Sequence, residues 1–214
     1  MPGEVAEIAS MTEGLRLSET PGRAADSPLA AMIERARQGD TSAFEEIIDR
    51  YQQKVMTTSW RMLGSQEDAR DASQEVFLRV YRYLGGFKLD QDFSGWLYRI
   101  IVNVCRDYAR KRGSRHQFAS FEDEREAGTF ESLTSVEDVE GDAIRSQQRA
   151  LIAEALDALS ARERAALVLR DLEGLSTEEV ARVLGSSQTT VRSQISSART
   201  KIKQYRDRVM KRRG

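Results

Sequence analysis

Residues 176–202 read STEEVARVLGSSQTTVRSQISSARTKI and give the clearest indication of the fold. It begins with a capping-box pattern, in which the Ser176 oxygen accepts a backbone N–H and the Glu179 side chain reaches back. The apolar residues after it form a short helix that ends at Gly185. A longer helix follows, with apolar residues from Val191 onward at steps of four, three and four. A short capped helix, a tight turn and a longer helix are typical of a helix-turn-helix.

The outer face of the longer helix is rich in side chains that donate hydrogen bonds. Hydroxyl and guanidinium groups of this kind reach the base edges and phosphates of DNA. Arg192 either pairs with a guanine through two hydrogen bonds or simply binds a phosphate. The alternative is a two-helix hairpin with a solvated outer face. The residues of the predicted DNA-reading face are Ser187, Gln188, Thr189, Thr190, Arg192, Ser193, Ser196 and Arg199.

The helices before this motif complete a small C-terminal domain over residues 146–214. An apolar stripe follows residues 151–159 at helical spacing, and Ser160 with Glu163 forms another capping box. The next helix is expected to end at Gly174.

Four further helical patterns predict an N-terminal domain over residues 29–113. The longer ones each carry an apolar stripe, which indicates a helix with one buried face. The three prolines lie at positions 2, 21 and 28, so that none interrupts these helices. The patterns run from Leu29 to Arg37, from a cap at Asp40, Thr41 or Ser42 to Gly64, from Ser65 to Gly85, and from a cap at Ser94 to near Gly113.

The charges of the chain are arranged in blocks, although the net charge is only −1. Residues 99–115 carry six basic residues and one acid, and residues 192–213 carry nine basic residues and one acid. Between them, residues 122–142 hold nine acids and one arginine, which predicts a flexible acidic linker over 114–145. Residues 1–28 show no clear period and predict a flexible arm. The predicted fold is therefore all-α, with two small helical domains joined by the acidic linker.

The chain has few residues for catalysis or metal binding. It has one cysteine, Cys105, and therefore cannot form a disulfide framework. Because it also has only one histidine, His116, it offers very few Cys and His side chains for a metal site or a catalytic triad. We therefore expect no cofactor and no enzymatic activity. No apolar run approaches the ~20 residues of a membrane span, and the N-terminus lacks the basic start and apolar core of a signal peptide. These features predict a cytoplasmic protein.

The last helix of the N-terminal domain places aromatic residues beside basic ones. Phe87, Phe93, Trp96 and Tyr98 precede or overlap a row of arginines and a lysine within residues 99–112. Aromatic faces stack unpaired bases while cations hold the backbone, so the pattern suits capture of a DNA single strand. The alternative is that Trp96 and Tyr98 are ordinary core residues, and for Trp96 the pattern alone favours the core.

Together these segments resemble the extracytoplasmic-function (ECF) sigma factors of the sigma-70 family, over about residues 29–210. The motifs are QEDARDASQEVFLRVY at 66–81, FSGWLYRIIVN at 93–103, DYARK at 107–111, LSARER at 159–164, LSTEEVA at 175–181 and TVRS at 190–193. Each motif alone is weak, but their conjunction in this order is specific. The N-terminal arm is longer than the family's minimal pattern. Ser196 is small where some relatives have a bulkier residue, so a preference for one −35 sequence is not carried over.

The resemblance implies three interfaces. Sigma region 2, over residues 29–113, docks on the clamp helices of the polymerase β′ subunit through Asp68, Asp71, Gln74, Glu75 and Phe77, a face that pattern alone indicates is only solvated. Region 2 also melts the −10 element and holds its non-template strand with one base flipped out. Region 4, over residues 146–214, reads the −35 element through the recognition helix. The implied −10 residues are Phe87, Lys88, Phe93, Trp96, Tyr98, Arg99, Asn103, Asp107, Arg110 and Lys111.

The implied function is promoter-specific initiation of transcription, in which two linked domains bind two DNA elements together. The implied partners are core RNA polymerase through its β′ and β subunits, promoter DNA in duplex and single-stranded form, and an anti-sigma factor, without membrane insertion. The main alternative is a stand-alone, dimeric helix-turn-helix regulator. Another is an interaction protein with sigma-like domains and no promoter activity. We also hypothesise that the two domains fold against each other when inhibited, hiding both DNA-binding faces.

Overall fold

The computed structural model of the chain describes residues 28–118 and 154–213, which form helices and connecting loops with no strand among them. The predicted all-α class is thus confirmed for these residues. Residues 1–27 of the predicted N-terminal arm and residues 119–145 of the predicted acidic linker lie outside the described residues. Pro28, predicted as part of the arm, begins the first described helix, and residues 114–118, predicted as linker, are helical. The predicted domain boundaries stay predictions.

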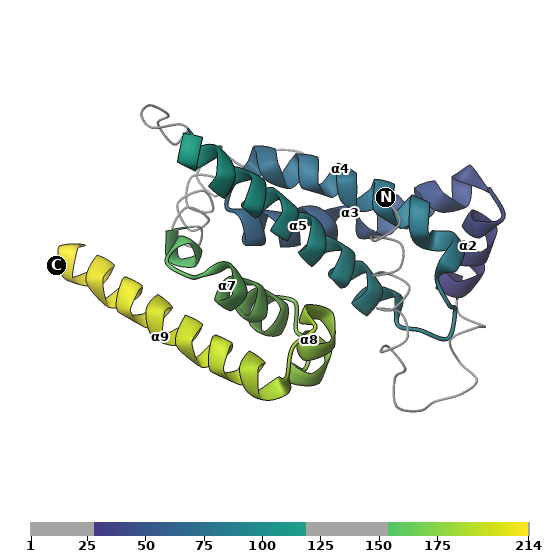
Figure 1. Cartoon of the computed structure of the whole chain (residues 1–214). Helices are drawn as coiled ribbons and strands as arrows, with labels where there is room; N and C mark the ends of the chain where they lie inside the picture. Colours follow the sequence, from purple (N-terminus) through teal and green to yellow (C-terminus); the bar gives the residue numbers. More distant parts are fainter. Residues whose placement is uncertain (1–27, 119–153, 214) are drawn as a thin grey trace, which may run out of the picture.

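Residues 28–118 form a first group of helices, coloured from purple to teal in Figure 1. In this group α3 packs against α2, α4 and α5, and α4 packs against α5. The buried side chains Val55, Val76 and Ile101 come from α3, α4 and α5 and are completely inaccessible to solvent. The elements are α2 (Pro28–Arg37), α3 (Thr41–Leu63), α4 (Gln66–Tyr83), the 3-10 turn η1 (Leu84–Gly86) and α5 (Phe93–Phe118).

The ends of α3 and α4 follow the local signals in the sequence. The side chain of Asp40 accepts a hydrogen bond from the backbone N–H of Ala43 and caps α3. Gly64 ends α3 at φ 74°, a left-handed conformation that favours glycine. Ser65 then caps α4 by accepting from the N–H of Asp68. The predicted limits of α3 and the predicted start of α4 are therefore confirmed, whereas α4 ends at Tyr83 and passes into a 3-10 turn before Gly85.

Helix α5 differs from the prediction at both ends. Its first turn is capped by Asp92, which accepts from the N–H groups of Ser94 and Gly95, so the prediction of Ser94 as the cap is wrong. The aspartate is favoured because its carboxylate faces two free N–H groups at the positive end of the helix. The helix also continues through Gly113 to Phe118. One glycine costs a helix only about 1 kcal/mol, and no proline follows it to end the helix.

Residues 154–213 form a second group, coloured green to yellow in Figure 1. The capping boxes at Ser160 and Ser176 are both present, as predicted. The helix after Ser160 does not stay α-helical to Gly174, because its last turn widens into a π-helix that the sequence pattern did not predict. The elements are α7 (Ala161–Leu167), the π-turn η2 (Val168–Leu172), α8 (Thr177–Leu184) and α9 (Gln188–Arg213).

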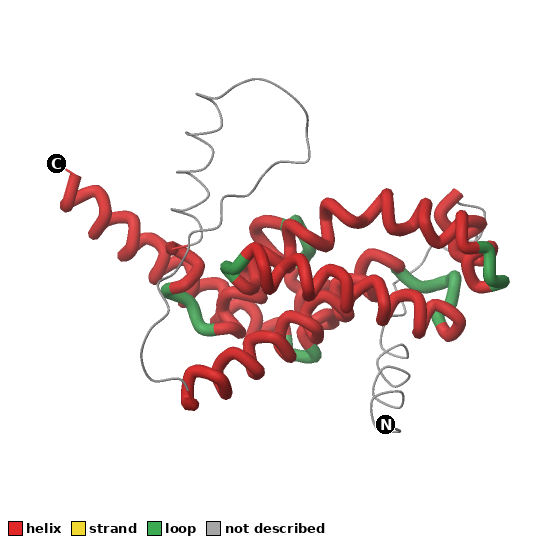
Figure 2. The backbone as a smooth tube through the Cα atoms, turned by 90° about the horizontal axis from the view of Figure 1, so that it is seen from above, coloured by secondary structure: helices red, strands yellow, loops and turns green. Residues whose placement is uncertain are grey.

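The two groups pack against each other. Helix α5 contacts α7 and α8, and α3 contacts α7 and η2. One apolar cluster runs through both groups and includes Ile101 and Val104 from α5 with Leu169 and Val180 from the second group. Figures 1 and 2 both show α9 along the outside of the second group, with its C-terminal end extending beyond the rest of the described chain.

Candidate nucleic-acid and polymerase interfaces

The helix-turn-helix predicted from residues 176–202 is present as α8 and α9. Gly185 ends α8 at φ 61°, and the hydroxyl of Ser187 accepts from the backbone N–H of Thr190 to start α9. Val180 of α8 packs in one cluster with Val191 and Ile195 of α9. The buried contacts fix the angle between the two helices and turn the opposite face of α9 outward.

The predicted DNA-reading face of α9 is exposed along its whole length. Two of its guanidinium groups are held by neighbouring side chains. Arg192 donates to the side-chain oxygen of Gln188 at 3.1 Å, and Arg199 donates twice to Asp171, at 2.9 and 2.7 Å. A bidentate pair of this kind occupies two donors of Arg199, whereas Arg192 keeps most of its donors. The exposed residues are Ser187, Gln188, Thr189, Thr190, Arg192, Ser193, Ser196 and Arg199.

The aromatic members of the predicted −10 set are buried in the first group. Phe87, Phe93 and Trp96 form one cluster with ring centroids 5.0 to 5.5 Å apart, and Tyr51 packs on Phe93 at 5.2 Å. All three cluster members and Tyr98 expose at most 4% of their surface. In this structure these rings stabilise the loop before α5, as the alternative of core residues predicted for Trp96.

The polar members of the −10 set line up along α5 and the loop before it. Lys88, Arg110 and Lys111 are exposed, and Lys111 lies over the ring of Tyr108 at 5.7 Å. Arg99, Asn103 and Asp107 are partly buried and occur one turn apart on the same helix. Because residues four apart share a helix face, α5 presents a polar row that ends in two exposed cations.

Glu173, just after the π-turn, joins the two groups of helices. Its carboxylate accepts hydrogen bonds from Thr58, Arg61 and Tyr98 of the first group, each at 2.9 Å. Its side chain is only 8% exposed, which strengthens these charge-assisted contacts. Burial, followed by the charge of Glu173, raises the pKa of Tyr98 above its usual range, so Tyr98 remains a hydrogen-bond donor.

Two arginines also cross between the groups, each capping the end of a helix. Arg99 donates to the carbonyl of Arg182 in the last turn of α8 at 2.7 Å. Arg164, which is 8% exposed, donates to the carbonyl of Arg61 near the end of α3 at 2.7 Å. The last carbonyls of a helix lack the regular α-helical hydrogen bond, and these guanidinium groups supply a donor to them, although the Arg182 carbonyl also accepts from the N–H of Gly185 at 3.4 Å.

The contact between the groups covers part of the predicted −10 face. Tyr98 and Arg99 both bond to the second group, whereas the DNA-reading face of α9 is exposed. The arrangement therefore covers only part of the predicted −10 face and leaves the predicted DNA-reading face of α9 exposed. Our hypothesis that both are hidden when the protein is inhibited stays a prediction.

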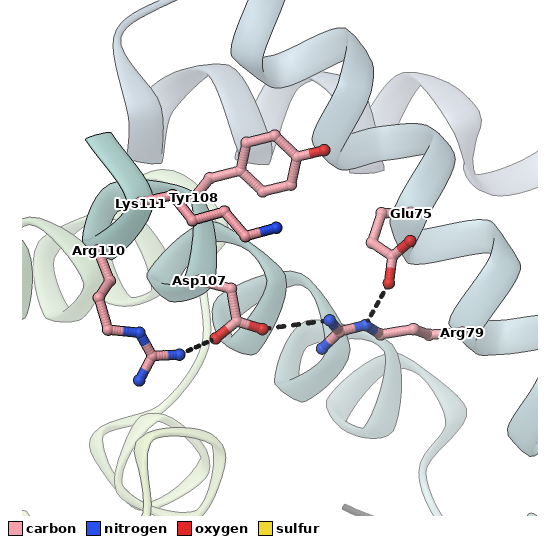
Figure 3. A pocket seen from close by; sticks show the side chains of 6 residues that line it. All are labelled: Glu75, Arg79, Asp107, Tyr108, Arg110 and Lys111. Carbon is pink, nitrogen blue, oxygen red and sulfur yellow. Dashed lines mark hydrogen bonds and ion pairs between the residues drawn. The ribbon is translucent and has the colours of Figure 1, made fainter. Parts of the chain in front are cut away.

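A polar cavity of about 330 Å³ lies between α4 and α5. Its lining joins the predicted polymerase-docking residue Glu75 to three residues of the predicted −10 set. Figure 3 shows the side chain of Arg79 between the carboxylates of Glu75 and Asp107, with Arg110 on the far side of Asp107. The lining residues are Glu75, Arg79, Asp107, Tyr108, Arg110 and Lys111.

The predicted polymerase-docking residues lie on α4, which makes its main contacts with α3 and α5. Asp71 and Gln74 are exposed, and Asp68, Glu75 and Phe77 are partly buried. Two apolar residues of this helix that were not among the predicted site residues, Leu78 and Tyr81, are each 59% exposed. The sequence could have indicated them, because the helical spacing of positions 71, 74, 78 and 81 places Leu78 and Tyr81 on the same face as Asp71 and Gln74.

The predicted site residues also do not include Thr58, Arg61, Arg79 and Glu173. No local signal identifies Thr58, Arg61 and Glu173 as interface residues, because their partners lie about a hundred positions away in the chain. Within the described ranges, no group of three or more His, Cys, Asp and Glu side chains could hold a metal ion. None of the described helices combines the length and apolar character needed to cross a membrane.

Comparisons with known proteins identify both groups of helices. Residues 47–115 match the model of sigma-70 region 2, and residues 149–202 match that of sigma-70 region 4. The chain is 35% identical over 174 residues to the RNA polymerase sigma-H factor of Pseudomonas aeruginosa, covering 80% of this chain and 90% of that protein. It is 37% identical over the same length and coverage to the ECF RNA polymerase sigma-E factor of Escherichia coli K12.

Two solved structures are similar over most of the chain. CnrH, solved in complex with the cytosolic domain of CnrY, is 25% identical with a TM-score of 0.60, over 83% of this chain and 96% of that one. The sigma factor RpoE of Bartonella quintana, solved with the anti-sigma factor NepR, shares the fold with a TM-score of 0.62 at 20% identity, over 77% of this chain and 96% of that one. From both region matches and these relatives, we conclude that the chain belongs to the extracytoplasmic-function group of the sigma-70 family of RNA polymerase sigma factors.

Proposed function

We propose that this chain directs initiation by docking on core RNA polymerase, capturing the melted −10 element with region 2 and reading the −35 element with region 4. The observation that carries the proposal is the exposed row of hydroxyl and guanidinium groups on α9, presented by a helix-turn-helix within the region 4 match. The chain supplies recognition, and bond formation belongs to the polymerase, so the chain itself is not an enzyme. It acts where the polymerase and DNA are, in the cytoplasm.

In this proposal α4 contacts the β′ subunit of the polymerase. Asp68, Asp71, Gln74, Glu75 and Phe77 form the docking face, and the exposed Leu78 and Tyr81 extend it. Two large apolar side chains amid acidic ones suit an interface that combines an apolar centre with a charged rim. Region 4 contacts the β subunit.

The −10 strand is proposed to follow the polar row of α5. Lys88, Arg110 and Lys111 hold phosphates, and Arg99 and Asn103 contact bases or sugar. Tyr98 and Arg99 are available only after region 4 leaves region 2. Stacking of a base on Phe87, Phe93 or Trp96 likewise requires the buried aromatic cluster to open.

Anti-sigma factors are a further proposed partner class, because the sigma factor RpoE of Bartonella quintana, which shares this fold, was solved in complex with the anti-sigma factor NepR.

The test is a footprint of the reconstituted holoenzyme on a promoter, read together with permanganate reactivity of unpaired thymines. Arg192→Ala should remove protection of the upstream element. Asn103→Ala should keep that protection and reduce thymine reactivity in the downstream element. Loss of both signals together in each variant, with core binding intact, would show that the two groups do not read separate elements.

A further inference from the structure

A chain of four charged side chains joins α4 to α5 and ends at the predicted DNA face. Arg79 donates to Glu75 one turn earlier on α4 at 2.7 Å and to Asp107 of α5 at 3.1 Å. The second oxygen of Asp107 accepts from Arg110 at 2.5 Å. Figure 3 shows the four side chains linked in the order Glu75, Arg79, Asp107 and Arg110 along the wall of the cavity between the two helices.

Asp107 is poorly suited to contact DNA directly. A carboxylate repels phosphates, and it can accept but not donate a hydrogen bond. Both of its oxygens are already engaged by guanidinium groups, and only 28% of its side chain is exposed. Its neighbour Arg110 is 79% exposed and uses one nitrogen for Asp107, which leaves donors directed to solvent.

Arg79 is held in place and is mostly buried. Its side chain is 16% exposed and lies between two carboxylates. Burial lowers its pKa, but the hydrogen bonds with Glu75 and Asp107 outweigh that effect and raise it overall, so the cation persists at any physiological pH. Arg79 therefore acts on Asp107 rather than on DNA.

We infer that Arg79 is a positioning residue for the −10 interaction: it shares the charge of Asp107, and thereby leaves Arg110 free to bind a backbone phosphate. Asp107 is then the anchor between the two arginines and not a DNA ligand. The inference rests on the proposed function, because it requires that Arg110 contacts promoter DNA. It adds to that function a residue on α4 that makes no DNA contact of its own.

The inference predicts an unusual pattern of mutational effects. Without Arg79, Asp107 keeps Arg110 as its strongest partner and draws that guanidinium onto both of its oxygens, in the bidentate geometry that arginine favours. The phosphate contact of Arg110 weakens as a result. Neutralising Asp107 in the same chain removes the competitor and releases Arg110 again. A purely structural link between α4 and α5 predicts the reverse, since losing both partners would weaken the link at least as much as losing one.

The experiment measures the affinity of the full-chain holoenzyme for a promoter fragment as a function of salt concentration. The variants are Arg79→Met, Asp107→Asn, the double variant, Arg110→Ala, and Arg79→Met with Arg110→Ala. The matched control is Arg70→Met, which removes the same charge from an exposed position of the same helix. Affinity for core polymerase and the midpoint of urea unfolding are measured for each variant.

We expect Arg79→Met to reduce promoter affinity about fivefold and the salt-dependence slope by about one, as expected for one lost phosphate contact. The double variant with Asp107→Asn should return to within about twofold of wild type. Arg79→Met should add nothing once Arg110 is alanine. Arg70→Met should bind like wild type.

The inference is overturned if Arg79→Met binds like wild type, or if the double variant binds as weakly as Arg79→Met. It is also overturned if Arg110→Ala leaves the salt slope unchanged, because no phosphate contact then exists to protect. If wild-type holoenzyme shows no promoter-specific binding, the proposed function itself fails, and that outcome is visible before any variant is compared.

Discussion

At the scale of single residues, the two arginines of the recognition helix differ in the hydrogen bonds that they make within the protein. Arg199 is bound by both oxygens of Asp171, whereas Arg192 makes one hydrogen bond with a neutral glutamine. A DNA contact by Arg199 must compete with the carboxylate, and a contact by Arg192 need not.

We therefore predict that Arg192→Ala weakens binding of the holoenzyme to the −35 element about tenfold or more, as for loss of a specific base contact. Arg199→Ala should weaken it by less than about threefold, because an exposed pair exchanges one partner for another. Fluorescence anisotropy with a labelled duplex measures both. Arg162→Ala, an exposed arginine on α7, is the control. A larger loss for Arg199→Ala than for Arg192→Ala would contradict this ranking.

Glu163 shows how one carboxylate makes region 4 sensitive to acid. Hydrogen bonds from Lys201, Ser197 and the capping residue Ser160 lower its pKa from 4.5 to about 2. A carboxyl group whose pKa is lower in the folded state than in the unfolded state stabilises the fold. This stabilisation is fully present at pH values above the pKa of the unfolded state, and it is lost as the pH falls through the pKa of the folded state. The loss should fall between pH 4.5 and about 2.

We expect Glu163→Gln to be less stable than wild type at pH 7 and to lose less stability than wild type across that window. Urea unfolding at several pH values gives the comparison. Glu178→Gln, an exposed position on α8, should follow the wild-type curve. A variant curve parallel to that of the wild type would show that Glu163 does not carry this dependence.

At the scale of elements, helix ends decide how α8 and α9 meet. Gly185 has φ 61° and no heavy atom within 4 Å of an added Cβ, so a side chain there meets backbone strain and no clash. Gly86 has equal space without a positive φ.

Gly185→Ala should therefore lower the free energy of unfolding by about 1 kcal/mol or more, the cost of a left-handed conformation for an L-residue. Gly86→Ala should change it by much less. Urea denaturation of both variants measures the difference. Equal effects would mean that the turn of the helix-turn-helix does not depend on the glycine conformation.

The elements were predictable where short-range chemistry determines them. Capping residues at Asp40, Ser65 and Ser176 and the glycine stops at Gly64 and Gly185 follow from the polar groups that a helix end leaves unsatisfied. The exposed face of α9 followed from the same periodicity. The cap of α5 was mispredicted because Asp92 and Ser94 both offer suitable oxygens. The π-turn after α7 has no distinct pattern, and the Glu173 and Arg79 contacts depend on tertiary packing.

At the scale of the whole molecule, region 4 lies against the part of region 2 that is proposed to bind the −10 strand. Glu173 is central to this contact, since it accepts hydrogen bonds from three side chains of region 2. In the proposed function, binding of the single strand through Tyr98 and Arg99 and packing of region 4 exclude each other. The proposal then predicts that the packed form lowers the affinity of the free chain for the −10 strand.

Glu173→Ala should weaken the packed form by about 2 kcal/mol, because it leaves donors without their charged acceptor. The free chain should then bind a −10 single-stranded oligonucleotide up to about thirtyfold more tightly. Anisotropy with the labelled strand tests this, and Glu178→Ala is the matched control on the exposed side of α8. Unchanged affinity of Glu173→Ala would show that packing of region 4 does not limit access to the strand.

The most direct test of the central claim is transcription reconstituted from purified chain, bacterial core RNA polymerase and a promoter library, with the initiated RNAs sequenced. We predict transcripts that start at a fixed distance downstream of a shared two-part element, and a reduction of these transcripts by Arg192→Ala and by Asn103→Ala. A chain that binds duplex DNA alone, while core polymerase gains no promoter-specific initiation from it, would contradict the proposed function and favour a stand-alone helix-turn-helix regulator.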